Sequence, residues 1–174
     1  MIMKIEDALF YANKVILGAD YGLYQHCLNV AGISHSACLE LGLDEELGFC
    51  SGLLHDCGKV VWLNNPLCFN FMEHPELSYA LLKDSNIDVA TIAYMHHSYQ
   101  INKYPEVCEI EVPDRLEIYC QLISFVDKVE ANMARSRARP EDAINTMSKI
   151  YMFNPEIIEV VKDIVTTRSE YPVI

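Results

Sequence analysis

The chain has 174 residues, of which 51% are hydrophobic, and its 13 basic and 25 acidic side chains give a formal net charge of −12. This length and composition fit one compact domain, residues 1–174, that buries a substantial core without cross-links. The acidity argues against binding to long nucleic acids or anionic membranes, so an anionic substrate must be held by a metal ion or a few local basic groups.

Apolar residues recur at intervals of three and four residues through most of the chain, while alternating strand-like stretches are scarce. This period predicts an all-α fold, a compact bundle of about seven to eight helices. The expected helices cover residues 4–17, 22–41, 44–59, 75–84, 86–98, 113–134, 140–151 and 154–168. Two stretches without a helical period, residues 60–73 and 99–112, are expected to be loops, and each follows a helix end that carries histidine.

Neither the N-terminus nor the cysteines point to export. The first ten residues include acidic side chains and no long apolar run, which argues against a signal peptide or a membrane span and predicts a cytoplasmic location. The seven cysteines form no C-x-x-C pair, and we interpret them as reduced thiols that pack as small hydrophobic groups. The apolar stripe of the last expected helix, at Ile157, Ile158, Val161 and Val165, suits either self-association or packing on the chain's own core.

Imidazole and carboxylate groups occur at positions where burial is expected. His26 lies on an apolar helix face. The pair His55-Asp56 follows one apolar run, and Asp127 lies inside another. For any one of these residues taken alone, a hydrogen bond or an ion pair in the core is the simpler interpretation. One divalent metal ion would satisfy all of them, because it binds neutral imidazole and cancels carboxylate charge.

The order of these residues resembles the HD superfamily of metal-dependent phosphohydrolases over nearly the whole chain. The segment His-Asp-x-Gly-Lys at residues 55–59 is the most specific part of the match. His74-Pro75 and the pair His96-His97 fall where the HDIG and HD-GYP branch of phosphodiesterases places additional metal ligands. Ser98 stands where HD-GYP proteins have an acidic residue, so the resemblance does not extend to specificity for cyclic di-GMP.

The resemblance implies a site for one or two divalent metal ions, such as iron, manganese or another transition metal. The first ion would be held by His26, His55, Asp56 and Asp127, and the second, bridged by Asp56, by His74, His96 and His97. Asp56 and Lys59 would be catalytic, with Lys59 facing the substrate phosphate. Lys128, Arg135 and Arg137 are further candidates to offset phosphate charge, although the two arginines suit a solvated helix end equally well.

The implied function is hydrolysis of a phosphate ester or phosphodiester in a nucleotide or cyclic dinucleotide, through a metal-activated water at a dinuclear site. Two alternatives stay open: an HD-fold di-iron oxygenase similar to myo-inositol oxygenase, and a non-catalytic signalling module. The complete ligand set favours catalysis. His35 has no counterpart in that set, and we expect it to stabilise its own helix. Aromatic side chains in the expected loops suit either stacking on a substrate or closing the core: Trp62, Phe69, Phe71 and Tyr99.

Overall fold

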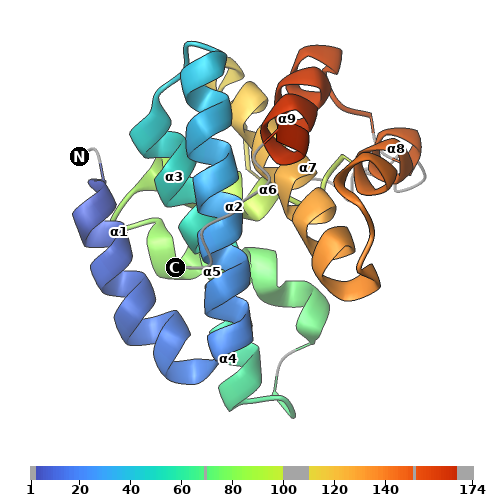
Figure 1. The fold of residues 1–174 in the computed structure, drawn as a ribbon. Coiled ribbons are helices and arrows are strands. Elements are labelled where there is room, and N and C mark those ends of the chain that lie inside the picture. The colour runs from blue at the N-terminus through green and yellow to red at the C-terminus, as the bar shows by residue number, and fades with distance from the viewer. Residues whose placement is uncertain (1–2, 69, 100–109, 151, 168–174) are drawn as a thin grey trace.

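The computed structural model describes residues 3–68, 70–99, 110–150 and 152–167 (Figure 1). Helices dominate these ranges and no strand occurs within them, so the all-α prediction is confirmed. The α-helices are α1 (Ile5–Ala12), α2 (Tyr21–Glu40), α3 (Glu45–Leu54), α4 (Lys59–Asn64), α5 (His74–Leu82), α6 (Ile87–Met95), α7 (Asp114–Ser136), α8 (Pro140–Ile150) and α9 (Pro155–Thr167). A π-helical segment, Asn13–Leu17, extends α1, and a 3-10 turn, Phe71–Glu73, leads into α5.

The long helix α2 runs through the middle of the molecule and contributes to two cores (Figure 1). It packs against α3 in one core and against α7 and α9 in the other. The apolar stripe of α9 lies in the second of these cores, where Ile157, Val161 and Val165 are buried, so packing within the chain accounts for it. No helix in the described ranges is both long and apolar enough to cross a membrane.

The predicted loop over residues 60–73 is wrong in part, because all of α4 except its first residue, and the 3-10 turn, lie within it. The helix predicted over residues 44–59 ends at Leu54, and residues 55–58 form a tight turn before α4 begins. The side chain of Val60 is buried, and Asn64 Nδ2 donates a hydrogen bond to the Val60 carbonyl oxygen at 2.9 Å. Six residues are too few to show a helical period in the sequence. Residues 100–109 of the other predicted loop, and residues 151 and 168 of the predicted helices, lie outside the described residues.

Helices α2 and α3 pack closely because a glycine stands at their crossing. A Cβ atom at Gly52 would lie 2.8 Å from Cα and 2.9 Å from N of Ala31, so a larger residue would have to push the α2 backbone away. The close approach brings His26 of α2 near the end of α3, where His55 follows. The packing of these two helices therefore positions the first functional side chains.

We expect Gly52→Ala to lower the free energy of unfolding by about 1–3 kcal/mol, because the added methyl group overpacks the interface. Gly32→Ala is the matched control: Gly32 lies on the exposed face of α2, with no atom near an added Cβ. Alanine there should leave stability unchanged or raise it by up to about 1 kcal/mol. Urea unfolding followed by circular dichroism measures both variants, and equal stabilities would contradict the close crossing.

Candidate metal centre

The first cluster joins side chains from three parts of the fold: His26 of α2, His55 and Asp56 of the turn after α3, and Asp127 of α7. One ligand atom from each lies within 4.8 Å of the others. His26 Nε2 lies 3.2 Å from Asp127 Oδ1, and His55 Nε2 lies 3.4 Å from Asp56 Oδ2. His55 and Asp56 are fully buried. The structure thus brings together the four residues that the sequence order groups.

A second cluster consists of His74 at the start of α5 and the pair His96-His97 after α6. Their Nε2 atoms converge, with 3.2 Å between His74 and His96 and 3.0 Å between His74 and His97. Asp56 connects this cluster to the first. Its Oδ2 faces the first cluster, while its Oδ1 lies 3.2 Å from Nε2 of His74 and 3.5 Å from Nε2 of His96. One carboxylate therefore faces both clusters.

The turn that carries His55 and Asp56 is fixed against the first turns of α5. The Ser78 hydroxyl accepts a hydrogen bond from Gly58 N at 2.8 Å and donates one to the His55 carbonyl oxygen at 2.9 Å. A Cβ atom at residue 58 would collide with the carbonyl oxygen of His74, so this approach requires glycine. These contacts set the position of His74 relative to His55 and Asp56, and so link the two clusters through the backbone.

Three rings are oriented by backbone carbonyl groups three residues earlier in the chain. Nδ1 of His55 lies 2.8 Å from the Gly52 oxygen, Nδ1 of His74 lies 2.7 Å from the Phe71 oxygen, and Nδ1 of His96 lies 2.5 Å from the Ala93 oxygen. A carbonyl oxygen can only accept a hydrogen bond, so each Nδ1 carries the proton and the lone pair of the neutral ring lies on Nε2. All three lone pairs face the clusters, as in histidines that bind metal ions.

Several atoms at the centre lack hydrogen-bond partners among the described residues. His26 Nε2, His55 Nε2 and Asp56 Oδ1 are buried and form no hydrogen bond there. An unsatisfied buried polar group costs roughly 1–3 kcal/mol, and more if it is charged. A divalent cation binds imidazole nitrogen and carboxylate oxygen together, so this donor set fits iron, manganese, zinc or a similar ion.

The electrostatic environment keeps the carboxylates ionised. Burial alone would raise the pKa of Asp56, but the nearby His55 ring and Lys59 ammonium group outweigh burial and hold this pKa well below its usual value. A similar balance between burial and neighbouring cationic groups keeps the pKa of Asp127 well below its usual value. Burial lowers the pKa of His96 to about 3, so its ring is neutral near pH 7. Against the effect of burial, contacts with the carboxylates raise the pKa of His26 to about 11 and that of His55 above its usual value. An ion that binds the first cluster would therefore displace protons from these two rings, because metal ions bind ionised carboxylates and neutral imidazoles.

Two lysines contact the cluster carboxylates. Lys59 forms an ion pair with Asp56, and Lys128 forms one with Asp127. Lys128 Nζ also lies 2.7 Å from Nδ1 of His97, so this side chain contacts both clusters. The lysine side chains are 13% and 14% exposed, which leaves their ammonium groups at the border between the clusters and solvent. Both are therefore positioned to meet an anion that approaches the clusters.

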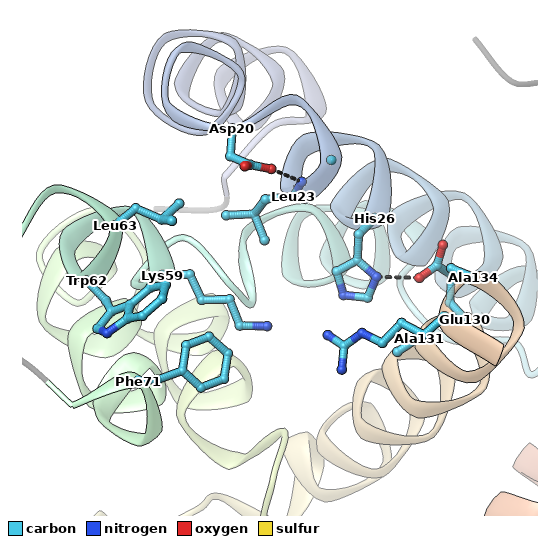
Figure 2. A pocket seen from close by; sticks show the side chains of 12 residues that line it. Asp20, Leu23, His26, Lys59, Trp62, Leu63, Phe71, Glu130, Ala131 and Ala134 are labelled. Atoms are coloured by element: carbon cyan, nitrogen blue, oxygen red, sulfur yellow. Dashed lines mark hydrogen bonds and ion pairs between the residues drawn. The ribbon is translucent and has the colours of Figure 1, made fainter. Parts of the chain in front are cut away.

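A cavity of about 360 Å³ lies beside the first cluster (Figure 2). Its lining residues are Asp20, Gly22, Leu23, His26, Lys59, Trp62, Leu63, Phe71, Glu130, Ala131, Ala134 and Arg135. Figure 2 shows Lys59 reaching between the aromatic side chains and His26. The rings of Trp62 and Phe71 meet edge to face at 5.1 Å, and Lys59 Nζ lies 5.4 Å from the Phe71 centroid. The cavity thus combines an aromatic wall with an ammonium group.

The remaining candidate residues lie in different places. Arg135 lines the cavity and is exposed, whereas Arg137 is absent from the described lining and ends α7 with a left-handed φ of 51°. The ring of Tyr99 packs against Phe153 of the core, at a centroid distance of 6.0 Å. Phe69 lies outside the described residues. Of the aromatic candidates, Trp62 and Phe71 are therefore the two that the structure places at the cavity.

Sequence reasoning missed Glu130 of α7. Its buried carboxylate contacts His26 Nδ1 and accepts a hydrogen bond from Asn29 Nδ2 at 2.9 Å. Glu130 follows Asp127 by three residues, which places both side chains on the same face of one helix. Once Asp127 is recognised as a site residue, this spacing identifies Glu130 as a second candidate.

Comparison with known proteins agrees with this geometry. The family model for the HD domain matches residues 23–132. The crystal structure of the HD domain of the L. monocytogenes phosphodiesterase PgpH matches with a TM-score of 0.66 at 19% sequence identity, over 88% of this chain and 94% of that chain. The same domain in complex with cyclic-di-AMP matches with a TM-score of 0.65 at 18% identity, over the same shares. No curated protein sequence matches the chain. At these identities the structural likeness shows the fold.

We expect EDTA to lower the thermal midpoint, Tm, of protein loaded with Mn(II) by about 5–10 °C. An ion at 100 times its Kd adds about 2.7 kcal/mol of stability, and each kcal/mol is worth roughly 2–4 °C in a chain of this size. Asp127→Ala should show a smaller shift, because it lacks a ligand of the first cluster. His35→Ala should keep the shift, because His35 packs on Phe49 outside both clusters. Differential scanning fluorimetry measures Tm. An unaltered protein whose Tm changes neither with Mn(II) nor with EDTA would contradict the metal centre.

Proposed function

The chain belongs to the HD domain family, a superfamily of metal-dependent phosphohydrolases, and we propose that it hydrolyses a phosphate ester or phosphodiester bond in a nucleotide or cyclic dinucleotide. The observation that carries this proposal is the carboxylate of Asp56, which faces two clusters of imidazole groups. A cavity with an aromatic wall and an ammonium group lies beside them. The cyclic-di-AMP bound to the structurally similar PgpH domain supports the choice of substrate class.

The proposed centre holds two divalent ions, with iron or manganese as the preferred metals. The ligands of the first ion are His26, His55, Asp56 and Asp127, and those of the second are His74, His96, His97 and the second oxygen of Asp56. When bound, two such ions polarise the phosphoryl oxygens and bring the pKa of a bound water near neutrality. The ionised carboxylates and the inward-facing ring nitrogens described above are the groups that would bind these ions.

Lys59 is the main catalytic side chain that the protein itself supplies beside the ligands. Its ammonium group lies between Asp56 and the cavity, so it can offset the charge that develops on a phosphoryl group during in-line displacement. Arg135, exposed at the cavity, offers a second cation for a non-reacting phosphate. Trp62 and Phe71 present aromatic surface next to Lys59, which suits a nucleobase. The substrate would thus place its phosphate toward the clusters and its base against the aromatic wall.

We expect the protein loaded with Mn(II) or Fe(II) to hydrolyse at least one member of a panel of nucleotides, cyclic dinucleotides and simple phosphodiesters. His55→Ala should reduce kcat by at least about 100-fold, because even groups behind a metal ligand contribute 10- to 100-fold to activity. His35→Ala, which changes a histidine outside both clusters, should retain activity. Chromatographic separation of the products measures turnover. Unchanged turnover in His55→Ala would refute hydrolysis at this centre.

The shared carboxylate predicts unequal effects of ligand removal on metal content. Asp56→Ala should lose ions from both clusters, because one oxygen of Asp56 faces each of them. His74→Ala should lose the second ion and keep the first, because His74 belongs to the second cluster. Elemental analysis of anaerobically reconstituted protein measures ions per chain, with circular dichroism to check helicity. Two retained ions in Asp56→Ala would contradict the bridging role.

A further inference from the structure

His26 is held differently from the other ligand rings. Nδ1 of His55, His74 and His96 faces a neutral backbone carbonyl oxygen. Nδ1 of His26 instead makes a short contact with Oε2 of Glu130, a carboxylate on α7. Figure 2 shows this contact at the edge of the cavity. The ring therefore has an anionic partner on the side opposite its ligand atom, Nε2.

The Glu130 carboxylate is itself fixed in place. Its residue is 6% exposed, and its second oxygen, Oε1, accepts a hydrogen bond from Asn29 Nδ2 at 2.9 Å. Asn29 lies three residues after His26 on α2, so both oxygens of Glu130 bind groups on the same helix face. Within the described residues, Glu130 forms its ion pair with His26 and with no lysine or arginine. Among the residues that the structure describes, no cationic side chain therefore competes with His26 for this carboxylate.

We propose that Glu130 is a positioning residue for the first metal ion. It holds one proton on Nδ1 of His26, so that Nε2, which lies 3.5 Å from Asp56 and 3.2 Å from Asp127, would be the atom offered to the first ion when that ion is bound. The role rests on the proposed function, in which the first cluster holds an ion. Because a carboxylate accepts the Nδ1 proton more strongly than a carbonyl oxygen, it also makes His26 a better electron donor than the three rings whose Nδ1 atoms face carbonyl oxygens.

A difference between the two metal positions follows from this contact. The first cluster contains two carboxylates and a histidine backed by a third, whereas His74 and His96 of the second cluster are backed by neutral carbonyl groups. More negative charge around the first position should bind a dication more tightly. We therefore expect the two ions to bind in sequence, with the ion at the first cluster the tighter one.

The test compares Glu130→Gln and Glu130→Leu with Glu117→Gln. Glu117 is an exposed glutamate of the same helix, and the hydrogen bond described for it joins Gln121 at 3.1 Å. Titration of the full chain with Mn(II), followed by calorimetry, gives the Kd of each ion. We expect the first ion to bind about tenfold more weakly in Glu130→Gln and 10- to 100-fold more weakly in Glu130→Leu, with Glu117→Gln unchanged.

The Nδ1–H resonance of His26 gives a readout that general destabilisation would not produce. In protein loaded with diamagnetic Zn(II), proton–nitrogen NMR should show this resonance shifted downfield and protected from exchange in the unaltered protein and in Glu130→Gln, whose amide oxygen still accepts. Glu130→Leu should lose both the shift and the protection. If Glu130→Leu fails to fold, Asn29→Ala replaces it, because this variant keeps the carboxylate and removes its anchor, and should weaken the first ion less.

A first-ion Kd within twofold of the unaltered protein in Glu130→Leu, or in both Glu130→Gln and Asn29→Ala, would overturn the role of Glu130. So would an unchanged His26 Nδ1–H resonance in Zn(II)-loaded Glu130→Leu. Failure of the unaltered protein to bind any Mn(II) would instead overturn the proposed function, and this role with it. The two failures are distinguishable because the first leaves metal binding intact.

Discussion

The structure depends on the joint burial of imidazole and carboxylate groups between its two cores. An ionised carboxylate that is fully removed from water, as Asp56 is, has a prohibitive free energy unless other groups compensate its charge. The compensating groups come from α2, α4, α5, α7, the turn after α3 and the residues after α6, so their arrangement forms only when these elements pack. Folding of the bundle and assembly of the site are therefore one process, and an ion that binds the assembled site also stabilises the fold.

The tight turn at residues 55–58 explains how one carboxylate reaches two clusters. A residue inside a helix presents its side chain to one neighbouring surface, whereas Asp56 lies where α3 has ended and α4 has not begun. Its two oxygens can then face different elements, one toward α2 and the other toward α5. The hydrogen bonds of Ser78 to both ends of this turn keep the orientation fixed. The irregular backbone is thus what allows the shared ligand.

The sequence predicts most of the helices and the grouping of the imidazole and carboxylate side chains, because hydrophobic periodicity fixes which face of each helix is buried and the resemblance gives the order of these residues. It does not predict Glu130, which stands in a stretch rich in charged residues and looks like a surface glutamate until α7 packs on α2. It also cannot separate Arg135 from Arg137. Arg135 lies in the last turn of α7 and lines the cavity, whereas the backbone leaves the helical conformation at Arg137, and the sequence does not mark the residue at which the helix ends. Contacts between segments that are distant in the sequence decide which charged residues of α7 lie at the site, and local sequence patterns do not contain those contacts.

The charge distribution bears on the size of the proposed substrate. The chain carries a net charge of −12, yet Lys59 and Arg135 both line the cavity beside the clusters. At physiological ionic strength, electrostatic interactions are screened beyond roughly 8 Å, so a small anion inside the cavity interacts with the groups that line it, these two cations among them, and little with the distant acidic surface. A long polyanion would extend many such lengths beyond the cavity, over a protein with nearly twice as many acidic as basic groups. Attraction by the cations in the cavity and repulsion by the net negative charge of the whole protein together favour a nucleotide over a nucleic acid as the substrate.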